Sequence, residues 1–318
     1  MPGMNWYPLK FVPIFKERIW GSRRLQEVFG KDLPAGQKIG ESWELADLPN
    51  DKSVIANGAF AGRTLSSVVS ECPKEILGPS GRPAAFPLLI KFLDAADILS
   101  VQVHPDAEAC RRMAKGELKT ECWYIIAADP GAFIYKGLQP GVTKQRFARA
   151  VAAGSVEPLL AKVPVEVGQC HHLPAGTVHA LGPGILVAEI QTPSDTTYRV
   201  FDWNRVDDMG RPRALHVQEA LESIHFGEDP GALPVTTVGR LVDCPFFRVD
   251  KGHRGAGAET LLSRGTMKVL VIVSGGGRIV DAAGEATEFR PGDCLLVPAA
   301  YEGVMQMKGN TEYLTVTL

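Results

Sequence analysis

Short apolar runs punctuated by glycine and proline follow one another along almost the whole 318-residue chain. Many of them alternate apolar and polar residues with a period of two or stay apolar for four to eight residues, which is typical of strands. The 33 glycines and 23 prolines supply a turn signal roughly every ten residues. The pattern predicts an antiparallel, all-β protein. The expected strands are 88–95, 98–105, 121–128, 132–138, 163–168, 169–175, 186–192, 197–203, 246–252, 268–275, 277–283, 294–299 and 313–318.

Three segments have helical spacing instead: 64–77, 143–153 and 215–226. In the last of them, Leu215 and Ile224 fall on one side of the predicted helix. Because these segments are short and isolated, we expect them to pack outside the sheets.

The segments that begin at Gly168 and Gly292 form an internal repeat with a constant offset of 124 residues. The matching pairs are Gly168 and Gly292, Cys170 and Cys294, Pro174 and Pro298, and Ala175 and Ala299. A turn glycine, an apolar strand and a closing proline are typical of a β-barrel hairpin, so the repeat predicts two related barrels. With proline-rich 227–235 as the linker, the chain divides into a catalytic unit, 1–234, and a second unit, 235–318.

The two units differ where chemistry would occur. His179 of the first falls opposite Gly303 of the second, whose single histidine is His253. The second unit therefore cannot form a multi-histidine site, and we expect it to be structural or to shape the substrate pocket.

Composition indicates a soluble globular protein, with 45% hydrophobic and 22% charged residues. The net charge of −2 and the lack of a basic run argue against a nucleic-acid partner. No stretch approaches the roughly 20 apolar residues of a membrane span. Six cysteines without a CxxC pair, in a chain without a secretory signal, predict reduced thiols and a cytoplasmic location.

A candidate metal site comes from three separate segments. Gln102 and His104 are two residues apart in a predicted strand, so both side chains should point to one face, the barrel interior. Glu121 and His179 follow in later segments. Two imidazoles, a carboxylate and an amide oxygen suit Zn²⁺, and also Fe²⁺, Co²⁺ or Mn²⁺. For the remaining histidines we expect ordinary hydrogen bonding instead.

At these residues the chain resembles the type I mannose-6-phosphate isomerases of the cupin fold. The motifs that carry the resemblance are WGS at Trp20, IGESWELAD at Ile39, SVQVHPD at Ser100, LKTECWY at Leu118, PAGTVHAL at Pro174 and EIQTPSDTTYRVFDWNR at Glu189. The resemblance implies two cupin (jelly-roll) barrels with a few short helices, as in the shorter bacterial branch. It also implies one Zn²⁺ per chain, held by Gln102, His104, Glu121 and His179. The implied activity interconverts mannose 6-phosphate and fructose 6-phosphate, in a monomer or homodimer whose partner is the small sugar phosphate.

The resemblance further implies a set of pocket residues. They are Lys119, Glu189 and Arg199 as catalytic residues, and Ser100, Trp20, Glu41 and Asp195 as substrate-binding residues. By the period of two, Lys119 shares the inward face of Glu121, which makes it the preferred general base, with Glu189 as the competitor. Arg199 could neutralise developing charge or hold the phosphate. The chain departs from the family pattern at Leu118, Thr120 and Leu181.

Two other functions are open on the same barrel. A sugar-phosphate-binding cupin with a structural metal would need only the four ligands, so Lys119 and Arg199 argue against it. A metal-dependent oxygenase usually holds iron by histidines and a carboxylate, which Gln102 fits less well.

Overall fold

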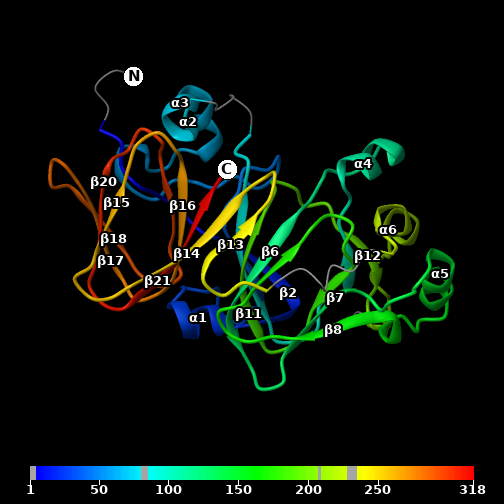
Figure 1. Ribbon diagram of the computed structural model, residues 1–318. Helices are drawn as coiled ribbons and strands as arrows, with labels where there is room; N and C mark the ends of the chain where they lie inside the picture. Colours follow the sequence, from blue (N-terminus) through cyan, green and yellow to red (C-terminus); the bar gives the residue numbers. More distant parts are fainter. Residues whose placement is uncertain (1–4, 80–84, 207–208, 228–234) are drawn as a thin grey trace.

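The structure is a computed structural model that describes residues 5–79, 85–206, 209–227 and 235–318. Two β-barrels lie side by side, with short helices at the periphery (Figure 1). All pairs between named strands in the described residues are antiparallel, which confirms the predicted all-β class. The predicted linker falls on 228–234, which lie outside the described residues.

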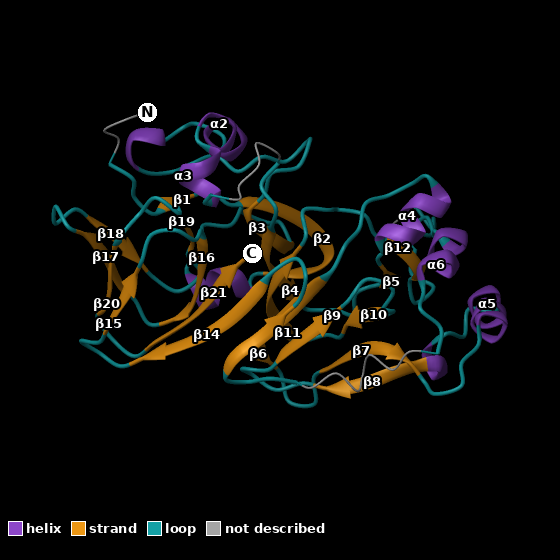
Figure 2. Cartoon of the chain, turned by 45° about the horizontal axis from the view of Figure 1, so that its top comes forward, coloured by secondary structure: helices purple, strands orange, loops and turns teal. Residues whose placement is uncertain are grey.

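Two sheets form the first barrel (Figure 2). One has the order β2-β3-β4-β11-β6-β9, with bounds Ile14–Ser22, Ile39–Leu45, Leu89–Ala95, Ile185–Gln191, Glu121–Ala128 and Cys170–Leu173. The other has the order β12-β5-β10-β7-β8, with bounds Tyr198–Phe201, Val101–Val103, His179–Leu181, Phe133–Leu138 and Leu160–Pro164. Trp123 of the first sheet and Ile134 of the second belong to one buried cluster, so the two sheets enclose a shared interior.

The second barrel also has two sheets. The six-stranded one has the order β1-β19-β16-β21-β14-β13, with bounds Leu9–Lys10, Cys294–Val297, Lys268–Ser274, Thr311–Thr317, Arg248–Arg254 and Gly239–Asp243. The four-stranded one has the order β15-β20-β17-β18, with bounds Glu259–Leu262, Gly303–Met307, Gly277–Asp281 and Ala286–Phe289. The N-terminal strand β1 thus pairs with β19 and extends a sheet of the C-terminal barrel. Side chains such as Phe289, Met305 and Tyr313 fill the interior of this barrel.

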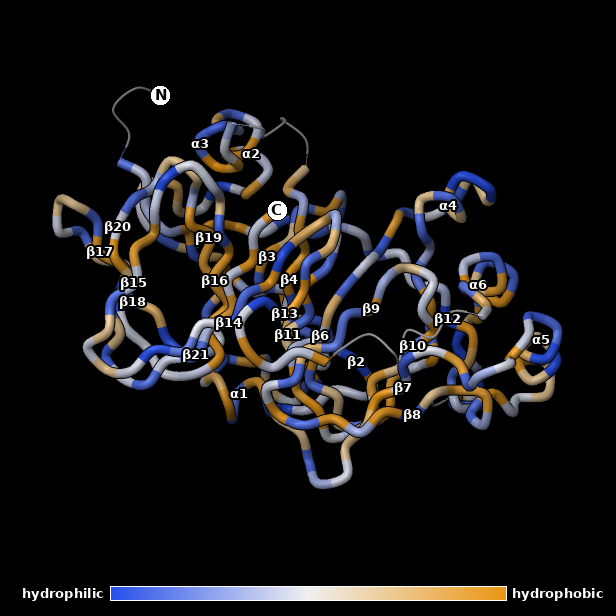
Figure 3. The backbone as a smooth tube through the Cα atoms, viewed as in Figure 1, coloured by the Kyte–Doolittle hydropathy of each residue, from blue (hydrophilic) through white to orange (hydrophobic). Residues whose placement is uncertain are grey.

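The two barrels share a buried wall. Strands β3, β4 and β11 are buried on both faces. This burial accounts for the mostly apolar sequences of β4 and β11. On β4, Phe92 and Ile90 face a core that also contains Val269 and Leu314 of the second barrel. Figure 3 shows the apolar colouring concentrated on such central strands and the polar colouring on loops and outer helices.

The repeat predicted from the sequence appears in the backbone hydrogen bonds. The amide of Gly168 donates to the carbonyl of Ile125 at 2.9 Å, and the amide of Gly292 donates to the carbonyl of Ile272 at 2.8 Å. Strands β9 and β19 begin two residues later, at Cys170 and Cys294, and β10 and β20 begin at matching positions, His179 and Gly303. Both glycines have positive φ, 91° and 80°, which favours glycine at this turn. The turn glycine and the starts of two strands in each barrel therefore agree with the predicted offset of 124 residues.

The helices are α1 (Arg24–Phe29), α2 (Leu65–Glu71), α3 (Pro73–Leu77), α4 (Ala107–Met113), α5 (Lys144–Ala152) and α6 (Val217–Ser223), with short 3₁₀ turns at Gly58–Phe60 and Glu157–Leu159. The expected single helix over 64–77 is wrong, because Cys72 is non-helical and Pro73 starts a new helix at its first position. Helices α1 and α4 were not expected. The expected strand 163–168 is also misplaced, since β8 ends at Pro164. No helix in the described part of the chain is long and apolar enough to cross a membrane.

Candidate active site

Strand pairing brings the predicted ligands together inside the first barrel. His179 of β10 lies directly opposite Gln102 of β5, and His104 follows β5 by one residue. Glu121 begins β6 of the opposing sheet. Its Oε2 lies 3.2 Å from His104 Nε2, and its Oε1 lies 3.3 Å from His179 Nε2. One ligand atom from each of these three buried residues lies within 4.8 Å of the others.

Backbone carbonyls fix the orientation of both imidazoles. His104 Nδ1 lies 2.9 Å from the Thr196 carbonyl, and His179 Nδ1 lies 2.8 Å from the Thr177 carbonyl. Since a carbonyl can only accept, each Nδ1 donates and each Nε2 keeps a lone pair that points towards Glu121. This is the arrangement that metal-binding histidines usually adopt.

The donor set fits a divalent cation. Among the described residues, His104 Nε2 and both Glu121 oxygens are buried without a hydrogen bond, and only Glu121 Oε2 has a cation, Lys119 Nζ, at 3.0 Å. Such burial is costly unless another group satisfies these atoms. Burial, and next Lys119, lowers the pKa of His104 to about 3, so its ring is neutral. Burial alone would raise the pKa of Glu121, but Lys119 and His104 hold it well below its usual range. Neutral imidazoles and a carboxylate are the forms that bind metals.

Gln102 stands beside this group. Its amide Nε2 lies 3.3 Å from His179 Nε2. Because the two ends of a carboxamide have nearly the same shape, rotation about its last bond would present the oxygen to the same point. The four predicted ligands therefore occupy one place in the barrel, three as a tight cluster and Gln102 at its edge.

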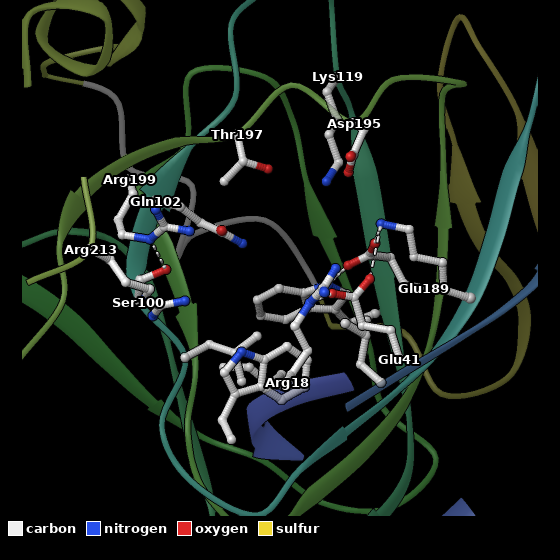
Figure 4. Close-up of a pocket in the computed structure, with 16 residues that line it drawn as sticks. Arg18, Glu41, Ser100, Gln102, Lys119, Glu189, Asp195, Thr197, Arg199 and Arg213 are labelled. Atoms are coloured by element: carbon white, nitrogen blue, oxygen red, sulfur yellow. Dashed lines mark hydrogen bonds and ion pairs between the residues drawn. The ribbon is translucent and has the colours of Figure 1, made fainter. Parts of the chain in front are cut away.

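A cavity of about 380 Å³ opens beside Gln102 and Lys119 (Figure 4). Every other pocket residue expected from the sequence lines it: Trp20, Glu41, Ser100, Glu189, Asp195 and Arg199. Lys119 Nζ lies 3.0 Å from Glu121 Oε2, so this buried amine connects the cavity to the candidate metal centre.

Two carboxylates on one side of the cavity are held by a buried lysine. Lys91 Nζ lies 3.1 Å from Glu189 Oε1 and 3.9 Å from Glu41 Oε2. Trp123 Nε1 donates to Glu189 Oε2 at 2.9 Å, and Trp43 Nε1 donates to Glu41 Oε2 at 2.7 Å. Both oxygens of Glu189 thus face a donor, and this carboxylate is fixed in place.

The other side of the cavity is positively charged. Arg199 Nε donates to Ser100 Oγ at 3.2 Å, and its Nη1 donates to the Ala214 carbonyl at 3.1 Å. Among the described residues Arg199 forms no ion pair, and burial followed by nearby Arg213 lowers its pKa. Asp202 holds Arg213 through both carboxylate oxygens. The cavity therefore has one side with carboxylates that are held in place. On its other side, the guanidinium of Arg199 has no carboxylate partner among the described residues.

Eight lining residues were not expected from the sequence, and four of these carry a charge or a hydroxyl group: Arg18, Lys91, Thr197 and Arg213. Lys91 left a detectable signal, because it is a lone cation inside the apolar run 88–95 that became a buried strand. Arg18 and Arg213 gave no such signal, because the sequence does not distinguish an arginine in a pocket from one on an ordinary surface.

Two of the histidines for which we expected ordinary hydrogen bonds, His216 and His225, form them. His225 Nε2 lies 2.8 Å from Asp106 Oδ2, and His216 Nδ1 accepts from the Arg199 amide at 3.3 Å. Neither belongs to the candidate metal cluster.

A jelly-roll barrel that directs two histidines, a glutamate and a glutamine at one point defines a metal-binding cupin. Residues 9–128 match the family model described as "Phosphomannose isomerase type I, catalytic domain". The chain is 39% identical to mannose-6-phosphate isomerase of Streptococcus mutans over 96% of its length and 97% of that protein. It is 38% identical to the probable mannose-6-phosphate isomerase GmuF of Bacillus subtilis, over 97% and 98%.

Among solved structures, the mannose 6-phosphate isomerase of Bacillus subtilis superposes with a TM-score of 0.88 at 30% identity, covering 98% of this chain and 99% of that one. The chain belongs to the type I phosphomannose isomerase family.

Proposed function

We propose that the protein interconverts mannose 6-phosphate and fructose 6-phosphate. The observation that carries this proposal is one cavity that joins a candidate metal centre, the buried amine of Lys119 and the guanidinium of Arg199, which forms no ion pair with any described residue. The relatives that cover the full chain bear the name of this activity. A binding protein with a structural metal would need neither Lys119 nor Arg199 in the cavity.

The reaction moves a proton between two carbons of the sugar. A base removes the proton from C2 of the open-chain aldose, the electron pair forms the C1–C2 double bond of a cis-enediol, and O1 gains a proton. Return of a proton to C1, with loss of the O2 proton, gives the ketose. Gln102, His104, Glu121 and His179 would hold one Zn²⁺ per chain, which when bound supplies a Lewis acid for the sugar oxygens.

We assign the general base to Lys119 in preference to Glu189. Both Glu189 oxygens already face donors, so taking a proton would break the contacts to Lys91 and Trp123. Lys119 is buried and lines the cavity, where no fixed donor comparable to Lys91 and Trp123 has to be displaced among the described residues. Arg199 would stabilise negative charge or hold the phosphate, with Ser100 as its partner. Trp20, Glu41 and Asp195 would contact the sugar.

A coupled assay for fructose 6-phosphate, run with and without a chelator, tests the activity. Turnover should vanish with the chelator and return with Zn²⁺, and a chain that binds mannose 6-phosphate without turnover would be a binding protein. Lys119→Ala should abolish turnover and leave the bound metal in place, whereas Glu189→Gln should retain part of the turnover. Full activity in Lys119→Ala would reject the base assignment.

We also propose the division of the chain into units 1–234 and 235–318, the second being structural; its apolar interior supports this role. The protein would work in the cytoplasm, where its six free cysteines would stay reduced. It would act as a monomer or homodimer on a small sugar phosphate, without nucleic-acid or membrane partners; gel filtration with light scattering would determine its state.

A further inference from the structure

Thr197 places a hydroxyl group in the active-site cavity. It directly precedes β12 and lines the cavity together with Arg199, which follows two residues later. Because side chains along a strand alternate between its faces, Thr197 and Arg199 share the inward face, and Tyr198 between them packs into an apolar cluster on the other side. Figure 4 shows the hydroxyl of Thr197 directed into the cavity, on the side of Gln102 and Asp195.

The backbone around Thr197 is held by hydrogen bonds. In the pairing of β12 with β5, Tyr198 lies opposite Val103, so the same register places Thr197 beside His104. The carbonyl of Thr196 accepts from His104 Nδ1 at 2.9 Å. The segment that orients a candidate metal ligand therefore also sets the position of the Thr197 side chain.

The hydroxyl groups near Thr197 already have partners. Thr196 Oγ1 accepts from the Glu117 amide at 3.0 Å, and Ser194 Oγ donates to the Glu117 carbonyl at 3.2 Å. In the cavity, Ser100 Oγ accepts from an arginine at 3.2 Å. Thr197 Oγ1, by contrast, forms no hydrogen bond with any residue that the structure describes. A threonine hydroxyl can donate one hydrogen bond and accept two, so this whole capacity is open to a ligand.

The chemistry of this hydroxyl points to an alcohol as its partner. Around it, Lys119 contacts Glu121 at 3.0 Å and Lys91 contacts Glu189 at 3.1 Å, so these charged groups have fixed partners. Thr197 is neutral and can both donate and accept, which matches the capacity of an alcohol. The open-chain sugar phosphate carries alcohols at C3 and C4, between its reacting carbons and its phosphate.

We propose that Thr197 is a substrate-binding residue that forms a hydrogen bond with the C3 or C4 hydroxyl of the sugar phosphate. This inference rests on the proposed function and deepens it, because it adds a contact to the middle of the sugar chain. A role in packing alone would be served equally by valine, which has nearly the same shape without the hydroxyl. The two roles therefore differ in a single atom.

The test is Thr197→Val, with Thr315→Val as the matched control. Thr315 is a half-buried threonine of β21 in the second barrel, and its hydroxyl likewise forms no hydrogen bond within the described part of the chain. Thr197→Val should lower kcat/KM for mannose 6-phosphate about three- to tenfold, the range for loss of one neutral hydrogen bond. Thr197→Ser keeps the hydroxyl and should recover most of the loss, and Thr315→Val should have no effect.

Substrates that lack one hydroxyl identify the partner atom. With the 3-deoxy or the 4-deoxy analogue of mannose 6-phosphate, whichever lacks the bound group, the wild type and Thr197→Val should have equal kcat/KM. A loss of the same size on mannose 6-phosphate and on both analogues would overturn the inference. Wild-type kcat/KM in Thr197→Val would overturn it as well.

Calorimetric binding of mannose 6-phosphate to the metal-loaded protein separates this inference from the proposed function. If the wild type binds the sugar phosphate without turnover and Thr197→Val binds it about three- to tenfold more weakly, the contact stands and the activity fails. Normal turnover with equal affinity in both proteins would leave the activity and overturn the contact. Absence of both turnover and binding in the wild type would refute the two together.

Discussion

Replacing Lys91 by methionine should destabilise the protein strongly, because it would leave two buried carboxylates without their shared cation. Lys91 is 4% exposed and lies between Glu189 and Glu41, at 3.1 and 3.9 Å. Methionine matches the length of the lysine stem, but it loses the contact of the ammonium with the Trp43 ring, whose centroid lies 4.8 Å from Nζ. The substitution therefore removes charge with little change in volume.

The expected cost follows from burial. Breaking a buried ion pair by deleting one partner costs about 3–5 kcal/mol, since the remaining charge stays desolvated. Arg18 still neutralises Glu41, so most of the cost should arise at Glu189, whose other contact is the Trp123 indole. The Lys91 pKa is raised despite burial, chiefly by Glu189 and then by Glu41, which shows that the attraction exceeds the desolvation of the amine.

Urea unfolding followed by tryptophan fluorescence would measure the loss. Lys308→Met is the matched control: its ion pair with Glu288 is exposed, so it should cost less than about 1 kcal/mol. Adding Glu189→Gln to Lys91→Met should recover part of the stability. A cost below 1 kcal/mol for Lys91→Met at pH 7 would refute the buried-network interpretation.

Three further outcomes are expected. Glu121→Gln should abolish stoichiometric metal in elemental analysis, and adding metal at 100 times its Kd should stabilise the wild type by about 2.7 kcal/mol but leave the variant unchanged. Burial, and next Lys136, lowers the pKa of His171 from the usual 6.5 to about 4, so the folded state binds this proton more weakly than the unfolded state does. The free energy of unfolding should therefore fall by up to about 3 kcal/mol as the pH is lowered from 6.5 to 4. His171→Gln should make this decrease smaller. Gly40→Ala should cost about 1–3 kcal/mol in thermal unfolding, because its Cβ would lie 2.6 Å from Arg18 Cβ, whereas Gly309→Ala, which meets nothing within 4 Å, should be neutral.

Local spacing predicted that Gln102 and His104 lie on one face, because a strand fixes side-chain direction with a period of two. Gln102 and Ser100 therefore reach the same interior from one strand and its approach. Glu121 and His179 came from separate segments, and only their motifs linked them before the fold was known. The contact between Glu121 and His179 depends on two sheets closing on each other, which no local pattern specifies.

The unpredicted parts have equally physical causes. Lys91 belongs to the network because β4 is buried on both faces, and a run of apolar residues does not reveal which face is the barrel interior. Strand β3 was missed because Gly40, Glu41 and Glu44 break its apolar pattern, although all its residues are buried. Proline explains the error in 64–77, since Pro73 allows a helix to start but not to continue through it.

The pairing of β1 with β19 has a consequence for synthesis on the ribosome. Leu296, the partner of Leu9, is synthesised almost 290 residues after it. At 5–20 residues per second, roughly 15 to 60 s pass between the synthesis of β1 and that of its partner strand β19. Until then its edge groups can pair with any neighbouring nascent chain, so early chaperone capture of this segment would protect the yield of folded enzyme.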